Sequence, residues 1–374
     1  MVQYSGLRQW QDAGARDRAI ERLLALRAGL NQDVSSSNKL TSFHLATWNI
    51  RDFGGHKLNP GPRLPDSLFY IAEIISAFDL VAVQEVNEDL GEFETVMDLL
   101  GPHWTYIVTD PSGNQERLAF VYDTRKIHFR HIAGEIVLPA KQGAPPVQFN
   151  RTPFLVAFQA GWFKFNICTV HIYYGSSEDT TKRKQEIADI AEFFRKRQEK
   201  DGETYILIGD FNILNPQDPT MNALLGGGFA VPAELRHPSA LASGNYYDQI
   251  ALRTERKQVE IAKAGVFPWQ KYAFRNDEDY EVYRPFMPEK TKEGKPAKTD
   301  VTAYRTWRTW QMSDHLPLWA EIKMDFTDEY LNSLKTGHQP LAALPEMRNS
   351  SAPEGRPARK SRAKRPTWTP RGEV

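Results

Sequence analysis

Polar residues stand at the ends of several apolar runs in this sequence, at the points where strands of a sheet would end. A carboxylate or imidazole at such a point faces a cleft, and it needs a partner or a metal ion because burial without one is costly. Five places follow this pattern, and their order and chemistry carry most of the functional information. They hold Asn49 after HLATW, Glu85 after LVAVQ, His171 after ICTV, Asp210 and Asn212 in ILIGDFN, and Asp314 with His315 in SDHLPL.

The residue types at these places match one class of reaction. Glu85, Asp210 and Asp314 offer hard oxygen ligands to which the asparagine amides can add, a set that suits Mg²⁺, Mn²⁺ or Ca²⁺ rather than a soft metal. His171 and His315 can exchange protons near neutral pH. Hydrolysis of a phosphate ester needs such a set, because metal and amide donors offset charge on the phosphate oxygens while imidazoles move protons.

Each piece also has a structural alternative. A single strand-end acid such as Glu85 is typical of a surface residue, and a single histidine such as His171 is typical of a structural one. GDFN could be a turn in which Gly209 gives backbone freedom and Asp210 forms a local cap. All of them together, in this order and each at a strand end, favour the catalytic interpretation over a series of unrelated structural accidents.

Short runs rich in β-branched and aromatic residues must position these groups, and they predict strands. The runs are FHLATWNI, LVAVQEV, WTYIVTD, RLAFVYD, PFLVAFQA, WFKFNICTVHIYY, TYILIGDF, YYDQIAL and PLWAEIKM. Two amphipathic helices are predicted between them, over DSLFYIAEIISAF and KRKQEIADIAEFFRKR, each with one apolar face. This alternation predicts an α/β protein in which two sheets pack together with helices outside.

The chain divides into three parts by composition and residue pattern. Residues 1–40 predict an N-terminal helical extension and a polar linker, 41–336 the catalytic domain, and 337–374 a basic, Pro- and Arg-rich disordered tail. We expect the N-terminal helix to pack on the main domain, although a helix of this kind can also bind a partner. The basic tail has two interpretations, a phosphate-backbone contact and a plain solvated tail.

Residues 253–312 form a long, charged and aromatic insert within the predicted domain. Its central string has two interpretations: a surface that stacks on bases and holds phosphates, or an alternating strand with one buried aromatic face. We favour the strand. The string consists of Tyr304, Arg305, Trp307, Arg308 and Trp310.

Composition narrows the class of protein further. Of 374 residues, 47 are Lys or Arg and 47 are Asp or Glu, so nucleic-acid binding would require a local concentration of basic groups. The single cysteine, Cys168, excludes an intramolecular disulfide and a cysteine-based zinc site. The N-terminus has no apolar core of signal-peptide type, and no later run is long enough to span a bilayer. We therefore expect a soluble cytoplasmic monomer with no membrane partner.

As a set, the motifs TWNIRDF, QEV, GDFN and SDHLP resemble the signature of the deoxyribonuclease I-like endonuclease/exonuclease/phosphatase superfamily. The resemblance spans Phe43 to Met324. It implies a four-layer α/β sandwich, in which helices flank two packed mixed β-sheets and the active site lies at one edge. It also implies phosphoester hydrolysis that depends on Mg²⁺ or Mn²⁺, with Ca²⁺ as the alternative ion.

Carried over position by position, the resemblance implies a metal site and two histidines that bracket the scissile phosphate. Glu85 would be the principal metal ligand with Asn49 beside it, and Asp314 would lie near the metal or its water. His171 and His315 would be the bracketing imidazoles.

The resemblance also implies roles for residues around these groups. Asp210 would polarise the nucleophilic water or one imidazole, and Asn212 would donate to a phosphate oxygen. Glu116 in NQERLAFVYD matches the acid paired with the first histidine, and Asp248 in YYDQIAL the acid paired with the last. Such pairs fix the imidazole tautomer and raise its basicity. Arg151 in NRTPF would hold a substrate phosphate, with a surface strand residue as the alternative.

Within this superfamily the motifs GDFN, YDQIAL and SDHLPL are most similar to the DNA-cleaving branch. Residues 246–249 differ from the matching segment of inositol 5-phosphatases, and residues 172–173 differ from sphingomyelinases. Asn114 and Gln115 stand where deoxyribonuclease I has the tyrosine that packs into the DNA minor groove, so that contact with DNA is not expected.

Two functional hypotheses remain, and both are catalytic. The first is a DNA endonuclease of low sequence selectivity, with RNA as the alternative nucleic-acid substrate. The second is a phosphatase or phosphodiesterase acting on a small molecule or a lipid headgroup, with the insert shaping a closed pocket. A binding module without activity is disfavoured because every catalytic position is intact.

Overall fold

The computed structural model of this chain describes residues 2–34, 40–55, 61–139, 148–254, 259–276, 278–291 and 294–335. The strands are β1 (Ser42–Phe53), β2 (Leu80–Val86), β3 (Trp104–Val108), β4 (Arg117–Asp123), β5 (Ile127–Glu135), β6 (Phe154–Ala160), β7 (Phe163–His171), β8 (Tyr205–Asp210), β9 (Asp248–Arg253), β10 (Ile261–Val266) and β11 (Leu318–Lys323). The α-helices are α1 (Ala13–Asp33), α2 (Pro65–Ile75), α3 (Gly91–Leu100), α4 (Thr181–Asp201), α5 (Pro219–Gly226), α6 (Tyr280–Tyr283), α7 (Val301–Gln311) and α8 (Thr327–Lys335).

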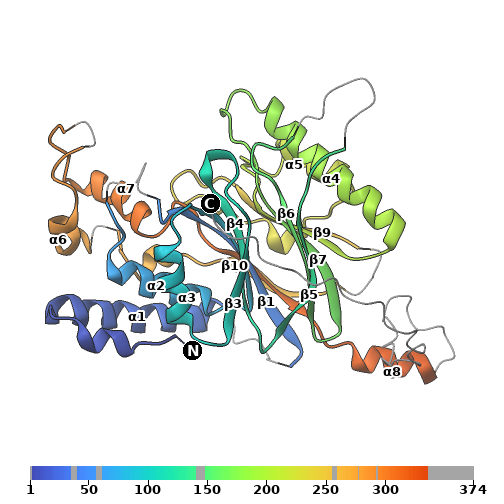
Figure 1. Cartoon of the computed structure of the whole chain (residues 1–374), viewed down its shortest axis with the longest axis horizontal. Coiled ribbons are helices and arrows are strands. Elements are labelled where there is room, and N and C mark those ends of the chain that lie inside the picture. The colour runs from blue at the N-terminus through green and yellow to red at the C-terminus, as the bar shows by residue number, and fades with distance from the viewer. Residues whose placement is uncertain are drawn as a thin grey trace, which may run out of the picture.

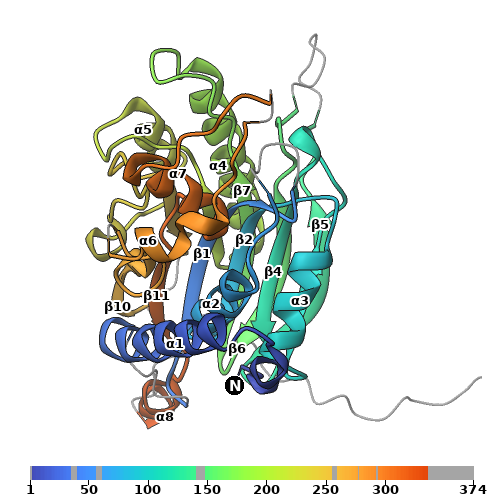
Figure 2. The ribbon, with the colours of Figure 1, turned by 90° about the vertical axis from the view of Figure 1, so that its left-hand side faces the viewer.

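The strands form two mixed sheets that pack face to face. One has six strands in the order β10-β11-β1-β2-β4-β3, and the other has five in the order β5-β6-β7-β8-β9. Helices α1, α2 and α3 cover the outer face of the first sheet, and α4 and α5 cover that of the second (Figure 1). The view in Figure 2 shows the same layers from the side of α1. The predicted four-layer α/β sandwich is confirmed.

Alternation along β1 sorts its side chains between two cores. Phe43 packs against Phe165 of β7 across the sheet interface, with ring centroids 5.6 Å apart. Trp48 and Ile50 belong to the opposite core, beneath the helices of the first sheet. Because side chains of a strand alternate between its faces, Asn49 shares a face with Phe43 and lies between the sheets. The period of the strand therefore directs this polar residue toward the sheet interface.

A layer of polar side chains separates the apolar core from the edge that carries Asn49. Gln84 of β2 is fully buried, accepts a hydrogen bond from Thr47 Oγ1 at 3.2 Å, and donates one to Thr169 Oγ1 at 2.9 Å. These bonds link β1 and β2 to β7 of the other sheet. Buried polar groups of this kind are stable when every partner is present, and they hold the two sheets in one relative position.

Helix α1 packs on α2 and is tied to it and to the insert by ion pairs. Arg18 Nε is 3.1 Å from Asp66 Oδ2 of α2, and Arg22 Nη2 is 3.1 Å from Asp279 Oδ1, just before α6. The helix thus packs on the main body, as expected. The domain boundaries near residues 40 and 336 stay predictions, and the basic tail lies outside the described residues, as does most of the polar linker.

The structure corrects the interpretation of the insert. Residues 301–311 form helix α7 and not an alternating strand. Asp300 caps the helix by accepting a hydrogen bond from Ala303 N at 2.8 Å, and Tyr304, Trp307 and Arg308 lie buried along one face. The spacing of these three residues is i, i+3, i+4, which is the helical period. The aromatic residues themselves, Tyr304, Trp307 and Trp310, are three positions apart, a spacing that does not fit a strand.

Six further elements escaped the sequence analysis: strands β5 and β10, and helices α3, α5, α6 and α8. Strands β5 and β10 are at sheet edges, and most of their side chains are at least partly exposed. They therefore lack the continuous apolar pattern of a central strand. In the part of the chain that the structure describes, no helix combines the length and the apolar character needed to cross a membrane.

Candidate active site

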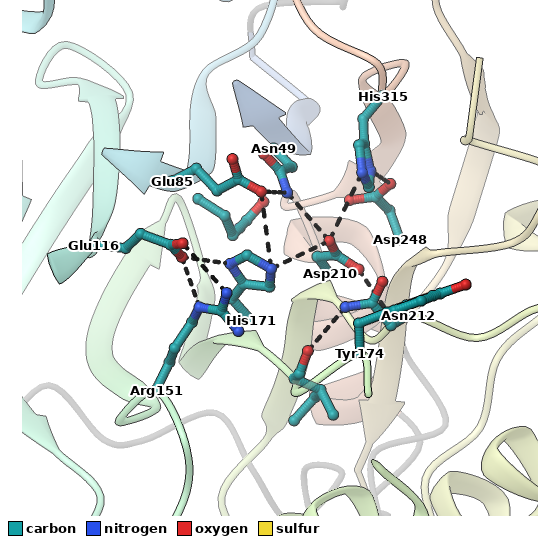
Figure 3. A network of polar contacts seen from close by, with 12 residues as sticks. Asn49, Glu85, Glu116, Arg151, His171, Tyr174, Asp210, Asn212, Asp248 and His315 are labelled. Atoms are coloured by element: carbon teal, nitrogen blue, oxygen red, sulfur yellow. Dashed lines mark hydrogen bonds and ion pairs between the residues drawn. The ribbon is translucent and has the colours of Figure 1, made fainter. Parts of the chain in front are cut away.

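Two parallel strand pairs bring the candidate residues to one edge of the sandwich. Strand β1 pairs in parallel with β2 in the first sheet, and β7 pairs in parallel with β8 in the second. Parallel strands end at the same edge of a sheet, so polar residues that follow them become neighbours. In register, Asn49 is opposite Gln84, next to Glu85, and His171 is opposite Asp210. Figure 3 shows these side chains pointing toward one another.

The backbone at two of these positions is in an unusual conformation. Glu85 has φ +60° and Asn212 has φ +54°, in the left-handed region that non-glycine residues rarely adopt. The register of β2 against β4 shifts between Val83 and Val86, so a bulge lies at Glu85. A bulge changes the direction in which a side chain points. Strain of this kind persists where surrounding structure enforces it, and it concentrates at functional sites.

Glu85 and Asn49 form a close polar pair. Asn49 Nδ2 donates to Glu85 Oε1 at 2.8 Å, and the backbone N–H of Asp52 donates to Glu85 Oε2 at 2.8 Å. Burial raises the pKa of the Glu85 carboxyl, against the lowering effect of His171 nearby. Asn49 Oδ1 is buried and has no hydrogen-bond partner among the described residues. A partly buried carboxylate beside a free amide oxygen is a donor set that fits a hard cation.

Asp314, the third predicted metal ligand, is not bonded to this pair. Its Oδ2 is 3.6 Å from Arg51 Nη1, and its side chain is 43% exposed. Its charge nevertheless raises the pKa of Glu85, so the two carboxylates interact electrostatically. Among the described residues, no three His, Cys, Asp or Glu side chains converge to hold a metal ion by themselves.

His171 is paired with the carboxylate of Glu116, which a buried arginine also contacts. Its Nδ1 is 3.0 Å from Glu116 Oε2, and Arg151 contacts the same carboxylate through Nε at 2.6 Å and Nη2 at 3.2 Å. Burial raises the pKa of Glu116, but His171 and Arg151 outweigh it and lower the pKa to about 2. Burial lowers the pKa of His171, and Glu116 with Asp210 raise it above its ordinary value. Glu116 is thus an ionised partner that orients the imidazole.

His315 is held in the same way by a different carboxylate. Its Nδ1 is 2.7 Å from Oδ2 of Asp248, which is fully buried. Burial lowers the pKa of His315, but Asp248 and Asp210 raise it well above its ordinary value. The carbonyl of His315 accepts hydrogen bonds from Trp48 Nε1 at 3.1 Å and Trp269 Nε1 at 3.2 Å. The main chain and the ring are therefore both fixed.

Asp210 lies at the centre of the arrangement. Its Oδ2 accepts a hydrogen bond from Asn49 Nδ2 at 3.1 Å, and it lies 3.6 Å from His171 Nε2 and 3.8 Å from His315 Nε2. Its Oδ1 accepts from the backbone N–H of Asn212 at 2.8 Å. One carboxylate thus faces both imidazoles and the Asn49–Glu85 pair, as Figure 3 shows. Groups that can bind a cation and move protons meet here within a few ångströms.

Comparison with known proteins identifies this arrangement. The model of the Endonuclease/Exonuclease/phosphatase family matches residues 46–279, more than half of the chain, and this range holds most of the residues described above. The chain belongs to this family. The predicted membership in the deoxyribonuclease I-like superfamily is confirmed, and the coarse activity that follows is hydrolysis of phosphate esters.

Similar proteins include deoxyribonucleases. Deoxyribonuclease gamma from Rattus norvegicus is 24% identical over 274 residues, which cover 66% of this chain and 84% of that protein. Deoxyribonuclease-1 from Homo sapiens is 29% identical over 205 residues, which cover 51% of this chain and 65% of that protein. An Endonuclease/Exonuclease/phosphatase family protein from Bacteroides thetaiotaomicron has a similar solved structure, with a TM-score of 0.49 and 17% identity, covering 76% of this chain and 99% of that one.

Two predicted phosphate ligands of this family member already have protein partners. Arg151 is 9% exposed and uses Nε and Nη2 for Glu116. Asn212 Nδ2 donates to the backbone carbonyl of Ile172 at 2.8 Å. Both side chains lie at the edge that carries the histidines, and both are restrained by these bonds. Their contact with a substrate phosphate stays a prediction.

A buried arginine that the sequence analysis did not single out braces the site. Arg183 at the start of α4 is fully buried, and its guanidinium donates to three backbone carbonyls. Nη1 contacts Asn212 O at 2.8 Å, Nη2 contacts Ser176 O at 2.9 Å, and Nε contacts Tyr174 O at 3.0 Å. It therefore ties the loop after β7 to the loop after β8. Its place in a charged helical run gave no sign of this role.

Arg183→Met is expected to lower the free energy of unfolding by about 3 kcal/mol or more, since each hydrogen bond to a charged group contributes about 1.5–3 kcal/mol. Urea unfolding followed by tryptophan fluorescence would measure the change. Lys184→Met is the matched control, because Lys184 is the next residue of the same helix and is exposed. Equal unfolding midpoints for the two variants would contradict the bracing role.

Proposed function

We propose that this chain is a divalent-metal-dependent phosphodiesterase that hydrolyses nucleic-acid phosphodiester bonds, and that it acts as a DNA endonuclease of low sequence selectivity. The observation that carries this proposal is Asp210, which faces two imidazoles and the Asn49–Glu85 pair. Each imidazole has its own carboxylate partner, so the set can handle the attacking and the leaving oxygen of one phosphodiester. Similarity to two proteins named as deoxyribonucleases supports DNA as the substrate.

Glu85 and Asn49 would hold Mg²⁺ or Mn²⁺, with Asp314 near the ion or its water. When bound, the ion supplies neutralisation of charge on the phosphate oxygens. Asp210 orients the attacking water and stabilises the imidazolium that forms beside it. Because Asp210 is fixed between the two imidazoles, it can orient the water and stabilise an imidazolium without moving.

His171 and His315 bracket the scissile phosphate in this proposal. Their Nδ1 atoms are engaged by Glu116 and Asp248, so each ring presents Nε2 to the substrate. The carboxylates raise the pKa of both rings, which favours a protonated imidazole that can donate to a phosphate oxygen or to the leaving group. One ring would act on the attacking oxygen and the other on the leaving oxygen, so each ring has its own carboxylate partner to orient it.

Arg151 and Asn212 would contact the phosphate from the same edge. Arg151 keeps Nη1 for that purpose while Nε and Nη2 bind Glu116. Asn212 is fixed by its own bond to Ile172, so that its position relative to Asp210 is constant. Donors that are already in place strengthen transition-state binding, because they need no reorganisation during the reaction.

The direct test is incubation of the purified chain of 374 residues with supercoiled plasmid in Mg²⁺, in Mn²⁺ and in EDTA. We expect nicked and linear plasmid in either metal and intact plasmid in EDTA. Hydrolysis of small phosphate esters without any cleavage of plasmid, single-stranded DNA or RNA would overturn the nuclease assignment. That outcome would favour the alternative of a phosphatase acting on a small molecule or lipid headgroup.

A further inference from the structure

An exposed aromatic ring lies at the edge of the candidate site, and none of the roles above uses it. Tyr174 follows His171 by three residues and is 38% exposed. The guanidinium of Arg183 lies 4.5 Å from the centroid of its ring. In Figure 3 the ring extends beside Asn212, on the histidine side of the site. A tyrosine ring exposed at this place, beside the candidate site, is available to stack on a base of a bound substrate.

Tyr174 is connected to the reacting groups through rings and hydrogen bonds. Its ring is edge-on to Tyr247, with centroids 6.2 Å apart and planes at 80°. The ring of Tyr247 in turn lies 5.5 Å from the imidazole of His315. Arg183 joins the carbonyls of Tyr174 and Asn212. The tyrosine is therefore presented by a braced loop, with the ring of Tyr247 linking it to His315, and the loop has little conformational freedom to lose on binding.

The opposite flank of the site has a second ring with a cation beside it. Arg51, two residues after Asn49, lies with its Cζ 3.7 Å from the ring centroid of Trp310 on α7. The same guanidinium is 3.6 Å from Asp314 Oδ2. Trp310 is half-buried, unlike Tyr304 and Trp307 of the same helix, which are buried. Rings with adjacent cations thus flank both the histidine side and the metal side.

We propose that this site takes an unpaired, single-stranded segment of nucleic acid, with Tyr174 as the ring on which the base next to the scissile phosphate stacks. This inference rests on the proposed nuclease function and narrows its substrate class. Aromatic rings combined with cations along a path are the way proteins bind single strands, because every base has a face that can stack. In a duplex each base already stacks on its neighbours and is paired, so reaching Tyr174 would cost unstacking and unpairing.

Tyr174 also accounts for selectivity without any base-specific contact. An aromatic ring can stack on all four bases, so it discriminates by the availability of the base rather than by its identity. The predicted low sequence selectivity and a preference for unpaired segments then follow from one feature. Tyr174 is a specificity-determining residue in this proposal, and the chemistry remains with Asp210 and the two histidines.

The experiment compares initial rates on three end-labelled substrates in Mg²⁺: a non-self-complementary oligonucleotide, the same strand annealed to its complement, and a strand of the same length with abasic sites. We expect the single strand to be cleaved at least about tenfold faster than the duplex. Tyr174→Ala should lower kcat/KM on the base-bearing strand about 5- to 150-fold, from the loss of one stacked base. Its loss on the abasic strand should be at least fivefold smaller.

Two further variants separate stacking from structural damage. Tyr174→Phe keeps the ring and should retain most of the rate on the single strand. Trp162→Ala removes another exposed aromatic, in the turn between β6 and β7 and in ring contact with Tyr330 of α8, and should match the unmodified protein. Equal losses for Tyr174→Ala on base-bearing and abasic strands would overturn the stacking role.

The outcomes also distinguish this inference from the proposed function. Cleavage of duplex at the rate of single strand or faster, or full activity of Tyr174→Ala on single strand, would overturn the inference while leaving the nuclease assignment intact. Absence of cleavage of every oligonucleotide, with hydrolysis of a small phosphodiester retained, would overturn the nuclease assignment itself.

Discussion

Glu85→Gln is expected to reduce phosphodiester hydrolysis roughly a thousandfold or more, because a bound cation supplies several kcal/mol of transition-state stabilisation. The change keeps the shape of the side chain, and the new amide oxygen can still accept the hydrogen bond from Asp52 N. It removes the negative charge that would hold the cation. The loss should therefore appear as weaker Mg²⁺ dependence as well as lower turnover, measured on plasmid over a Mg²⁺ titration.

The control for this prediction is Glu88→Gln. Glu88 follows the same strand and is exposed. The variant therefore removes one acid from the vicinity without changing the pair formed by Glu85 and Asn49. It should match the unmodified protein. Calorimetric Mg²⁺ binding should be lost in Glu85→Gln and retained in Glu88→Gln. Normal activity of Glu85→Gln, or undiminished activity of the unmodified protein in EDTA, would exclude this metal site.

Alanine at either histidine should lower kcat about a hundredfold to ten-thousandfold, the range expected for a general acid or base. The physical reason is that His171 and His315 each present Nε2 beside Asp210, at 3.6 and 3.8 Å. Their loss removes proton transfer but leaves the Glu85–Asn49 pair intact. Mg²⁺ affinity should thus stay close to normal while kcat falls, which single-turnover cleavage at several Mg²⁺ concentrations would measure.

The carboxylates behind the histidines should matter less. Glu116→Gln and Asp248→Asn leave the imidazoles in place and loosen their orientation, so we expect losses of about 10- to 100-fold. His128→Ala is the matched control, since His128 lies exposed on edge strand β5. A carboxamide variant less active than the alanine variant of its own histidine would show that the acid acts directly on substrate.

The central strands and helices α1, α2 and α4 were accessible from sequence because their signal is local. Central strands carry continuous apolar runs, and α4 repeats apolar residues at helical spacing. Edge strands β5 and β10 carry both polar and apolar side chains, because one edge and much of the side-chain surface of these strands face solvent. Helix α7 was misassigned although its aromatic residues, Tyr304, Trp307 and Trp310, recur at every third position. That spacing fits a helix and not the period of two of a strand.

The polar residues of the candidate site could be selected from sequence, but their contacts could not. Asn49, Glu85, His171 and Asp210 each follow an apolar run, and that pattern is visible one motif at a time. His171 and Asp210 are the last residues of β7 and β8, whereas β1 continues beyond Asn49 to Phe53. Nothing local shows that Asp314 is paired with Arg51 rather than bonded to Glu85. The backbone conformation at Glu85 is equally invisible, because a bulge depends on the strand that lies beside it.

The sequence by itself determined the family, the sandwich architecture and the polar groups that meet at its edge, since strand alternation decides which side chains turn inward. The tertiary structure alone decided which groups touch. Asn49 reaches Asp210 across 161 positions, and Asp248 reaches His315 across 67. It also committed two nitrogens of Arg151 to Glu116 and left Tyr174 exposed at the rim. The period of a strand or helix specifies the direction in which a side chain points. Its partner depends on how the elements pack together, because each buried polar group must be paired within the fold.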